Sequence, residues 1–506
     1  MRAPDRATRA FAAVAVAIAV AAFLAYAIVA VGLGDFDSAA GVFLALGHDT
    51  AGGHLYRPLI SEMGYGGTRY FPLFFALIAG FLRAGAGILT AGWLASAVSA
   101  VVLMAGMYRL VRRLDGAKWM AVLFAAASVA PYFVQQTLVE IRADVLAAAL
   151  NLWGLAFVLP AWRVDSTSDE YTRPWRAALA FTLALAVKVT SLAVPLVIIV
   201  AALAARRRHL ATALAWRLVV GIGVFFGLVV WLSGGLALES WRAVMSAGAG
   251  PAEMLRSVLA GDFLVLSGYS RLLLALLVIT SLAILAAVWW ATRHAIRPDA
   301  SRSLLVPTAL FVGASVTAVV LLSSPGTVAQ NHVIEWIEIA LVVLALIACT
   351  QKALTRTLVI TVAALTVWAS AQDFRHAYVL WQMRPDAATK AEIQRLIDDV
   401  AAAPGPVLSE SSVWPLVAGR SAYSIDAFAL RVVMQRRPDI ERDLINKINA
   451  QAFSFVILKV DPASAEGRGY YTHQNFNWPS ISRLLERYRL VSHPREDVFV
   501  YAPRRD

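Results

Sequence analysis

The sequence predicts an all-α polytopic membrane domain of about eleven transmembrane helices, followed by a small α/β extracytoplasmic domain. Hydrophobic residues make up 59% of the 506 residues and charged residues only 15%, and the mean hydropathy is +0.66. These values exclude a chain built only of soluble domains. Apolar runs of spanning length follow one another up to residue 371. From Gln372 onward, charged and apolar residues are mixed, and no run is long enough to cross a bilayer.

The net charge of +12 does not indicate a nucleic-acid partner, because Lys and Arg lie in short clusters between apolar runs. Such clusters are typical of topology signals. The single cysteine, Cys349, excludes an intrachain disulfide and a cysteine metal cluster.

The first apolar run, 10–33, follows Arg2, Arg6 and Arg9 and is longer than the ~7 to 15 residues of a signal-peptide core. We therefore expect a retained helix, with a cleaved signal as the alternative. By apolar length and flanking charge, clear spans lie near residues 10–33, 90–111, 118–134, 143–161, 213–235, 270–291, 304–322, 333–350 and 357–371.

The long run from Ala177 to Ala205 has arginines at both ends, which both favour the cytoplasm. An even number of crossings satisfies this preference. We therefore predict two short helices that turn near Lys188 to Ser191, with Pro195 helping to break the run.

The run from Phe71 to Leu82 is too short to span. A crossing there would move the basic residues Arg112, Arg113 and Lys118 to the outer side. We therefore predict an interfacial or re-entrant helix.

These choices give a bacterial inner-membrane protein with a cytoplasmic N-terminus and a periplasmic C-terminal domain. The inferred inner segments hold more than twice as many Lys and Arg as the outer loops before residue 372. The predicted domains are 1–371, with a first outer loop at 34–89, and 372–506. In the second domain we expect strands at 406–409, 453–460 and 498–501 and helices at 439–450 and 481–488.

Two carboxylates, Asp35 and Asp37, directly follow the first span in the segment Gly34 to Gly41. Acids at the membrane interface can deprotonate an acceptor hydroxyl or hold a divalent cation beside a phosphate. The alternative is that one of them caps the following helix, a role that Ser38 would share.

Further ionisable residues recur on the same predicted side. Arg142 and Lys188 are the candidates for gripping a phosphate, because guanidinium and ammonium groups neutralise its charge. The alternative for Arg142 is an internal ion pair with Glu140 or Asp144. As a single histidine at a helix start, His332 more often makes an interfacial hydrogen bond. The possible substrate-binding residues are Arg69, Tyr70, Asp144, Asn331, His332 and Glu335.

Several of these features form a recognisable combination. They are the acidic pair after the first span, Gly53-His54-Leu55-Tyr56, Tyr70-Phe71-Pro72, Arg142-Ala143-Asp144, Lys188 in a broken hairpin and an outer C-terminal domain. In this combination the chain resembles the GT-C superfamily of membrane glycosyltransferases. More narrowly, it resembles bacterial relatives of protein O-mannosyltransferases and lipid A aminoarabinose transferases. The resemblance covers the arrangement of residues 10–371.

In that family an acidic residue of the first outer loop is the catalytic base, which maps here onto Asp35 or Asp37. Asp-Phe-Asp replaces the usual Asp-Glu pair. We favour Asp37, because it lies further from the span, beside Ser38.

The resemblance implies a GT-C-like hexosyl- or pentosyltransferase that takes its sugar from a polyprenyl-phosphate donor. The acceptor would be a glycan, a lipid-linked saccharide or a protein, and membrane lipids are further partners. No nucleic acid is expected. No cofactor follows from the residues, although a divalent cation (Mg or Mn) at Asp35 and Asp37 stays open.

Two other classes stay open. A multi-span transporter or flippase of lipid-linked saccharides also uses buried charges such as Lys188. The absence of an internal repeat and the concentration of acids on one side favour the enzyme. A membrane scaffold with a partner-binding outer domain is the third class.

Overall fold

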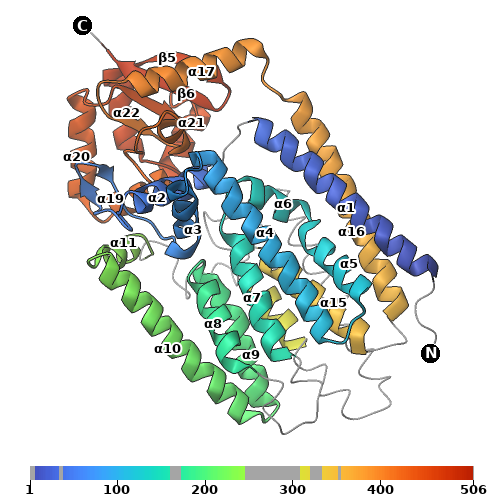
Figure 1. Cartoon of the computed structure of the whole chain (residues 1–506). Helices are drawn as coiled ribbons and strands as arrows, with labels where there is room; N and C mark the ends of the chain where they lie inside the picture. Colours follow the sequence, from blue (N-terminus) through green and yellow to red (C-terminus); the bar gives the residue numbers. More distant parts are fainter. Residues whose placement is uncertain are drawn as a thin grey trace.

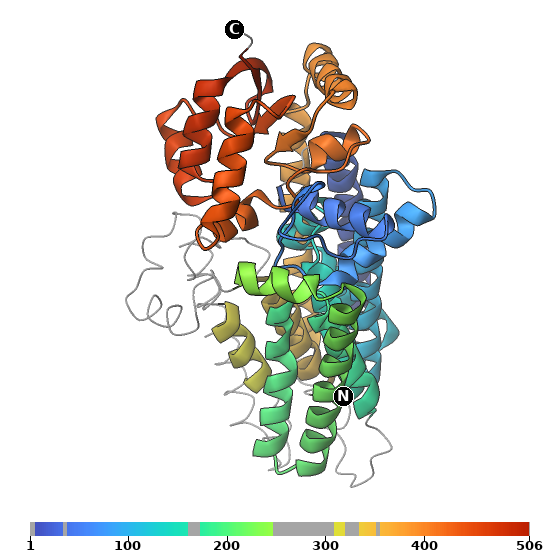
Figure 2. The ribbon, with the colours of Figure 1, turned by 90° about the vertical axis from the view of Figure 1, so that its left-hand side faces the viewer.

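The computed structural model describes residues 6–33, 38–159, 173–245, 308–318, 333–350 and 355–504. The molecule has two layers, a bundle of long helices and a smaller layer of strands and short helices (Figures 1 and 2). The smaller layer combines the segment after the first helix with the C-terminal part of the chain. The first helix begins at the end of the bundle that lies away from this layer (Figure 1).

The bundle helices are mostly apolar, and several expose large hydrophobic side chains such as Ile28, Val219 and Trp231. Exposed apolar faces of this kind are expected of helices that contact lipid. The bundle contains α1 (Arg6–Leu33), α4 (Ile88–Arg113), α5 (Lys118–Val129), α6 (Tyr132–Val139), α7 (Asp144–Val158), α8 (Pro174–Leu185), α9 (Ala193–Ala204), α10 (Arg208–Leu232), Thr308–Ala318, α15 (Ile334–Thr350) and α16 (Thr355–Gln382).

Within the described ranges, four helices, α1, α4, α10 and α16, are long and apolar enough to cross a membrane. The number rises to five if α5 and α6 together form one broken span. Several shorter apolar helices lie beside them. The predicted total of about eleven crossings therefore stays a prediction.

The predicted span at 118–134 is not one straight helix. It divides into α5 and α6, which meet at an angle of 64°. The break falls at Pro131, whose ring removes a backbone donor and prevents regular continuation of a helix. A hydropathy pattern does not register such a bend, because both halves are apolar.

The last span also differs from its predicted bounds. Helix α16 continues to Gln382, eleven residues beyond the predicted boundary at 371. At 1.5 Å per residue it is about 42 Å long, whereas the hydrocarbon core of a bilayer is about 30 Å thick. Its C-terminal end therefore extends beyond the bilayer, with exposed Tyr378 and Trp381 in the position of interfacial anchors.

The run from 177 to 205 forms two short helices, as predicted. Helix α8 ends at Leu185, the 3-10 helix η3 (Val189–Leu192) follows, and α9 begins at Ala193. Pro195 lies in the first turn of α9, where its missing N–H would have no helical partner anyway. The turn lies at the end of the bundle next to the smaller layer, because Leu73 N–H donates to Ala186 O.

The short apolar run after residue 70 forms α3 (Pro72–Arg83), which has twelve residues. Pro72 starts the helix, where proline is well tolerated. Its inner face buries Phe74, Phe75 and Ile78. A length of about 18 Å is too short for a crossing. The other elements of this region are α2 (Ser38–Ala51), β1 (Ile60–Ser61), β2 (Gly64–Tyr65) and α11 (Leu236–Met245).

The C-terminal part contains a four-stranded sheet in the order β3-β4-β6-β5, with a parallel β3/β4 pair and antiparallel pairing elsewhere. Each strand and helix predicted after residue 372 has a counterpart here. The elements are α17 (Ala387–Ala402), β3 (Val407–Ser409), α18 (Val413–Val417), α19 (Ala427–Met434), α20 (Pro438–Asn449), β4 (Phe455–Leu458), α21 (Ala465–His473), α22 (Trp478–Arg487), β5 (Tyr488–Arg495) and β6 (Val498–Pro503).

The first loop and the C-terminal part are tied together by buried contacts. Arg57 donates to Asp49 at 2.5 Å and to Ala422 O at 2.7 Å. Tyr65 is fully buried, and its hydroxyl donates to Asp443 at 2.6 Å. A Cβ on Gly64 would lie 2.0 Å from Tyr423 O, so the close approach of the two segments requires glycine there. These contacts hold both segments at the same end of the bundle.

Candidate active site

The predicted site residues fall into two groups. Asp35, Asp37, Asn331 and His332 lie outside the described residues. Helix α2 begins at Ser38, directly after the acidic pair. The capping alternative therefore stays open beside the catalytic one. The structure describes the remaining candidates, and it brings them to the end of the bundle next to the smaller layer.

Lys188 is held at the entrance of the α8–α9 hairpin. It has an extended backbone, with φ −151° and ψ 125°, and directly precedes η3. Its Nζ lies 2.5 Å from Asp144 Oδ1. Asp144 is the first residue of α7, where a carboxylate is favoured by the helix dipole. The predicted substrate residue Asp144 is thus the ion-pair partner of the predicted phosphate ligand Lys188.

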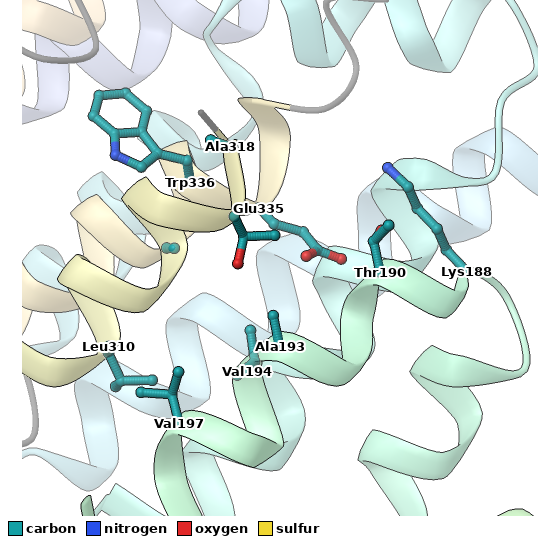
Figure 3. A pocket seen from close by; sticks show the side chains of 11 residues that line it. Lys188, Thr190, Ala193, Val194, Val197, Leu310, Ala318, Glu335 and Trp336 are labelled. Atoms are coloured by element: carbon teal, nitrogen blue, oxygen red, sulfur yellow. The ribbon is translucent and has the colours of Figure 1, made fainter. Parts of the chain in front are cut away.

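Glu335 lies close to this pair. It is in the first turn of α15 and accepts a short hydrogen bond from Ser191 of η3. Asn151 of α7 donates to Ser191 O at 3.3 Å. Figure 3 shows the Glu335 carboxylate directed across the cavity toward the segment that carries Lys188 and Thr190. Lys188 and Glu335 therefore lie at a single opening, and Asp144 pairs with Lys188 beside it.

This opening leads into a narrow, mostly apolar cavity between α9, Thr308–Ala318 and α15 (Figure 3). Its volume is about 20 Å³, which is roughly the space for one water molecule. Lys188, Thr190 and Glu335 form its polar rim. Its apolar walls include Val194, Val197, Leu310, Ala314 and Trp336.

Arg142 lies two residues before the start of α7 and pairs with Glu140. Its Nε is 2.8 Å from Glu140 Oε2, and Gln136 Nε2 donates to Glu140 Oε1 at 2.7 Å. The predicted alternative of an internal ion pair is therefore present. The Arg142 side chain keeps 18% of its surface exposed, so it remains accessible from solvent.

An unusual backbone between these two residues sets the direction of Arg142. Ile141 has a φ of +53°, which is rare for a β-branched residue. Its side chain is fully buried and packs against Gly92 of α4, where a Cβ would lie 2.7 Å from Ile141 Cδ1. Tight packing of Ile141 thus offsets the energetic cost of its backbone conformation and fixes the turn that carries Glu140 and Arg142.

Arg69 and Tyr70 face the C-terminal part of the chain. The Arg69 guanidinium lies 4.8 Å from the Phe428 ring centroid and 5.7 Å from that of Tyr70. Asp426 begins α19, where its Oδ1 accepts from Ala429 N–H at 2.9 Å. Burial raises the pKa of Asp426, while the Arg69 charge opposes that change. Asp426 was not predicted, because the sequence offers only a helix-cap signal.

The Arg69 and Arg142 clusters are neighbours. Burial raises the pKa of Tyr70, and both Arg69 and Arg142 act in the opposite direction. Burial is the largest effect on the pKa of Arg69 and lowers it, and the Arg142 charge lowers it further. Nearby Tyr70 and Asp426 raise this pKa, and the net shift is upward. Two cations from separate parts of the chain thus act on one tyrosine.

One further buried acid follows Glu335 by a single helical turn. Glu338 is only 1% exposed, and neither of its carboxyl oxygens has a hydrogen-bond partner within the described ranges. An acidic residue in the apolar run of α15 was a signal available in the sequence, since ionisable residues inside spans are costly. No described group of three His, Cys, Asp or Glu residues has the geometry to hold a metal ion.

The comparisons with known proteins address the fold and the family. ArnT from Cupriavidus metallidurans in the apo state is 15% identical over 96% of this chain and 97% of ArnT, with a TM-score of 0.60. The same protein bound to undecaprenyl phosphate is 13% identical over the same shares, with a TM-score of 0.58. The Archaeoglobus fulgidus oligosaccharyltransferase, in complex with Zn and sulfate, is 13% identical over 95% of this chain and 73% of that protein, with a TM-score of 0.51.

These likenesses confirm the predicted GT-C fold. No curated protein matches the sequence. The model of glycosyltransferase family 87 matches residues 70–325, which is half of the chain. This range includes Tyr70, Arg142 and Lys188 and ends before α15. The chain therefore belongs to glycosyltransferase family 87.

Proposed function

We propose that this protein transfers a hexose or pentose from a polyprenyl-phosphate donor to an acceptor on the outer side of a bacterial inner membrane. The observation that carries the proposal is the placement of Lys188, at the rim of an apolar cavity and on the same end of the bundle as the outer loop. A lipid-linked sugar has the matching parts, an apolar chain and an anionic phosphate.

Lys188 and Arg142 would hold the donor phosphate. Each is already beside a carboxylate, at 2.5 Å and 2.8 Å respectively. A phosphate would bind each cation together with its carboxylate partner or in place of it. Charge-assisted contacts of this kind are each worth about 1.5–3 kcal/mol. Glu335 and Asp144 would keep the lysine directed toward the rim while the site is empty.

The prenyl chain would lie along the apolar walls formed by α9, Thr308–Ala318 and α15. The cavity is far too narrow for such a chain as it stands. We therefore expect these short helices to separate when the donor enters from the lipid. The likeness to ArnT, which is known with undecaprenyl phosphate bound, supports this choice of donor.

In the proposed reaction, an acceptor hydroxyl attacks the anomeric carbon of the sugar. The bond from that carbon to the phosphate oxygen breaks, and polyprenyl phosphate leaves with the negative charge. Asp37 would take the hydroxyl proton, with Asp35 as its acidic neighbour. The family match begins at Tyr70 and does not include these two aspartates, so their role rests on the sequence argument. The acceptor is a glycan, a lipid-linked saccharide or a protein.

A divalent cation, Mg or Mn, bound by Asp35 and Asp37 would stabilise the leaving phosphate. Among the side chains that the structure describes, no alternative cluster offers three such ligands. Removal of divalent ions with a chelator, followed by their addition, tests this possibility directly. Transfer that is unchanged by the chelator would count against the cation.

The test of the proposed function is sugar transfer by the purified protein in nanodiscs, with polyprenyl-phosphate hexoses and pentoses as donors. General-base catalysis is typically worth ~10² to 10⁴-fold, so Asp37→Asn should lose about that factor in turnover. Binding of undecaprenyl phosphate should survive in this variant. Asp398→Asn, an exposed acid on α17, is the matched control.

Full activity in Asp37→Asn would overturn its assignment as the base. Full activity in both Asp37→Asn and Asp35→Asn would remove the first loop from the chemistry. A transporter or flippase would instead move labelled lipid-linked saccharide across the bilayer without transferring its sugar. The family assignment favours transfer.

A further inference from the structure

Four arginines form a group at the end of the bundle that lies away from the smaller layer. Arg109 and Arg113 lie in the last two turns of α4, and Arg173 and Arg176 lie at the start of α8. The charges of the other three all act on the Arg113 guanidinium, so the four side chains are neighbours. We call these four residues the arginine cluster.

The directions of two helices show where the arginine cluster lies. Helix α4 starts near the smaller layer, where Gly92 packs closely against Leu44 of α2, and it ends at Arg113. Figure 1 shows α4 extending from there toward the opposite end of the bundle. Helix α8 runs the other way, from Pro174 to the turn that carries Lys188. The arginine cluster and the proposed donor site are therefore at opposite ends of the bundle, and the predicted topology places the cluster on the cytoplasmic side.

The described side chains do not neutralise the arginine cluster. The charges that act on Arg113 are those of the other arginines, and no described carboxylate is among them. Arg113 donates to Ala156 O at 3.1 Å, which gives it a hydrogen bond but no opposite charge. Arg109 Nε is buried and has no hydrogen-bond partner in the part of the chain that the structure describes. Because like charges one helical turn apart repel each other, this arrangement favours a bound anion.

Aromatic rings of α7 hold two of the guanidinium groups in place. Arg109 lies 5.4 Å from the ring centroid of Trp153 and 5.7 Å from that of Phe157. Arg113 lies 5.1 Å from the same Phe157 centroid. Cation–π contacts of this kind orient a guanidinium, which can still donate hydrogen bonds to a phosphate. The two arginines are thus positioned before any anion binds.

The depth of the arginine cluster points to a lipid headgroup as the anion. Arg109 lies one turn, about 6 Å along the helix axis, closer to the middle of the bundle than Arg113. Trp175 at the start of α8 is 55% exposed and lies beside Arg176. Tryptophan and arginine together at the end of a membrane helix are typical of the interface between lipid and water. The phosphates of the lipid headgroups are concentrated at this level.

We propose that the arginine cluster binds the headgroup of an anionic phospholipid, of the phosphatidylglycerol kind, at the inner surface of the membrane. The arginines would hold the phosphate, and the half-buried rings of Trp153 and Phe157 would contact the glycerol and the first acyl carbons. Basic pockets between membrane helices are typical sites for anionic lipids. The bound lipid is neither donor nor acceptor. It would join the ends of α4, α7 and α8, and the last two of these lead to Asp144 and Lys188 at the other end of the bundle.

The experiment uses the full-length protein, purified in detergent and titrated with phosphatidylglycerol, with bound lipid counted by native mass spectrometry. We expect Arg109→Gln/Arg176→Gln to bind phosphatidylglycerol about tenfold or more weakly than the wild type, because each charge-assisted contact to a phosphate contributes at least that factor. Lys118→Gln/Arg208→Gln is the matched control, since it removes two exposed cations from the same end of the bundle. Arg173→Gln, at an exposed residue, should weaken binding in the same direction without disturbing the fold.

The unfolding temperature gives a second measurement. Phosphatidylglycerol should raise it in the wild type and in the control, because a ligand of the folded state stabilises that state, and should raise it less in the cluster variant. Phosphatidylcholine should bind more weakly, since its choline cation is repelled by the arginines.

Equal binding of phosphatidylglycerol by the cluster variant and the control would overturn the proposal, as would a wild type that binds none. Equal affinity of the wild type for phosphatidylcholine would also overturn it, because acyl-chain contact would then explain the binding. Displacement of phosphatidylglycerol by millimolar inorganic phosphate would show that the arginine cluster recognises the soluble anion instead of a lipid.

Discussion

Two buried Asp–cation pairs in this protein have the same chemistry and different surroundings. Asp49 and Arg57 are 2% and 1% exposed, and Arg57 also donates to Met63 O and Ala422 O. Asp144 and Lys188 are 9% and 17% exposed, and Lys188 lies at the rim of a cavity. Through the bond of Arg57 to Ala422 O, the first pair joins two distant parts of the chain, whereas Lys188 of the second pair lies beside a cavity.

The difference teaches how to separate a structural pair from a functional one. We call Asp49–Arg57 the closed pair, because both side chains are buried and Arg57 also binds two backbone oxygens. A closed pair has no room to exchange partners, so its contacts stabilise the fold. In the function that we propose, the cation of the pair at the opening takes the donor phosphate as a partner. Burial alone therefore does not distinguish the two pairs, whereas the cavity beside Lys188 does.

The largest expected effect is on the closed pair. Arg57→Ala leaves Asp49 buried without its cation, and breaking a buried pair typically costs 3–5 kcal/mol. We expect a clear decrease in the thermal unfolding temperature of the detergent-purified protein, with loss of contact between the first loop and the C-terminal part. Limited proteolysis after residue 384 should become faster.

Lys188→Ala is the matched comparison for stability, because it also removes the cation from a buried aspartate. We expect a smaller decrease in unfolding temperature, since Asp144 lies at a helix N-terminus and is partly accessible. Equal destabilisation by the two substitutions would break the distinction between the closed and the open pair.

The second effect is on donor affinity. Lys188→Ala and Arg142→Ala should each weaken undecaprenyl phosphate binding by roughly 1.5–3 kcal/mol. The fold should remain, as judged by gel filtration. Lys118→Ala, at the start of α5, is a control that should bind normally. Normal binding by both Lys188→Ala and Arg142→Ala would show that the open pair is structural as well.

Sequence reasoning succeeded where charge and length decide the structure. The arginines on both sides of 177–205 predicted the hairpin, and the short run after Phe71 predicted a helix that does not span. The same reasoning placed Lys188 at the turn. The length of an apolar run and the preference of arginine for the cytoplasmic side can both be read from a single stretch of sequence.

Contacts between distant segments were beyond its reach. The contact between Tyr65 and Asp443 joins the first loop to α20, and no residue pattern indicates it. The approach of Arg69 to Phe428 joins residues that lie hundreds of positions apart. The bend at Pro131 leaves the hydropathy pattern unchanged, and α16 continues past the end of its apolar run.

A third prediction concerns how packing directs Arg142. Gly92→Ala would place a methyl group 2.7 Å from Ile141 Cδ1 and 2.9 Å from Leu44 Cδ2. Overpacking of this kind typically costs 1–3 kcal/mol, and the displaced Ile141 would move Arg142. We expect weaker undecaprenyl phosphate binding with Lys188 intact. Gly80→Ala has open space around the new methyl group and serves as the control. Unchanged binding in Gly92→Ala would show that Arg142 is positioned by other contacts.

The smallest expected effect concerns a third buried acid, Asp426. Its side chain caps α19, and the charge of Arg69 acts on it. Burial raises the pKa of its carboxyl, against the influence of Arg69 and of the backbone N–H groups of Ala429 and Phe428. Its contribution to stability is therefore complete below the ordinary aspartate pKa and is lost as the pH rises through the raised value. Each pH unit between the folded and unfolded pKa corresponds to about 1.4 kcal/mol.

Asn is also a good helix cap, so Asp426→Asn keeps the bond to Ala429 N–H and removes the titration. The measurement is the thermal unfolding temperature of wild type and variant between acidic and neutral pH. We expect the wild type to lose stability relative to Asp426→Asn as the pH rises, because only the wild type must bury a charge. Two parallel profiles would mean that Arg69 compensates the buried carboxylate fully. Asp426 and Arg69 would then be a closed pair of the same kind as Asp49 and Arg57.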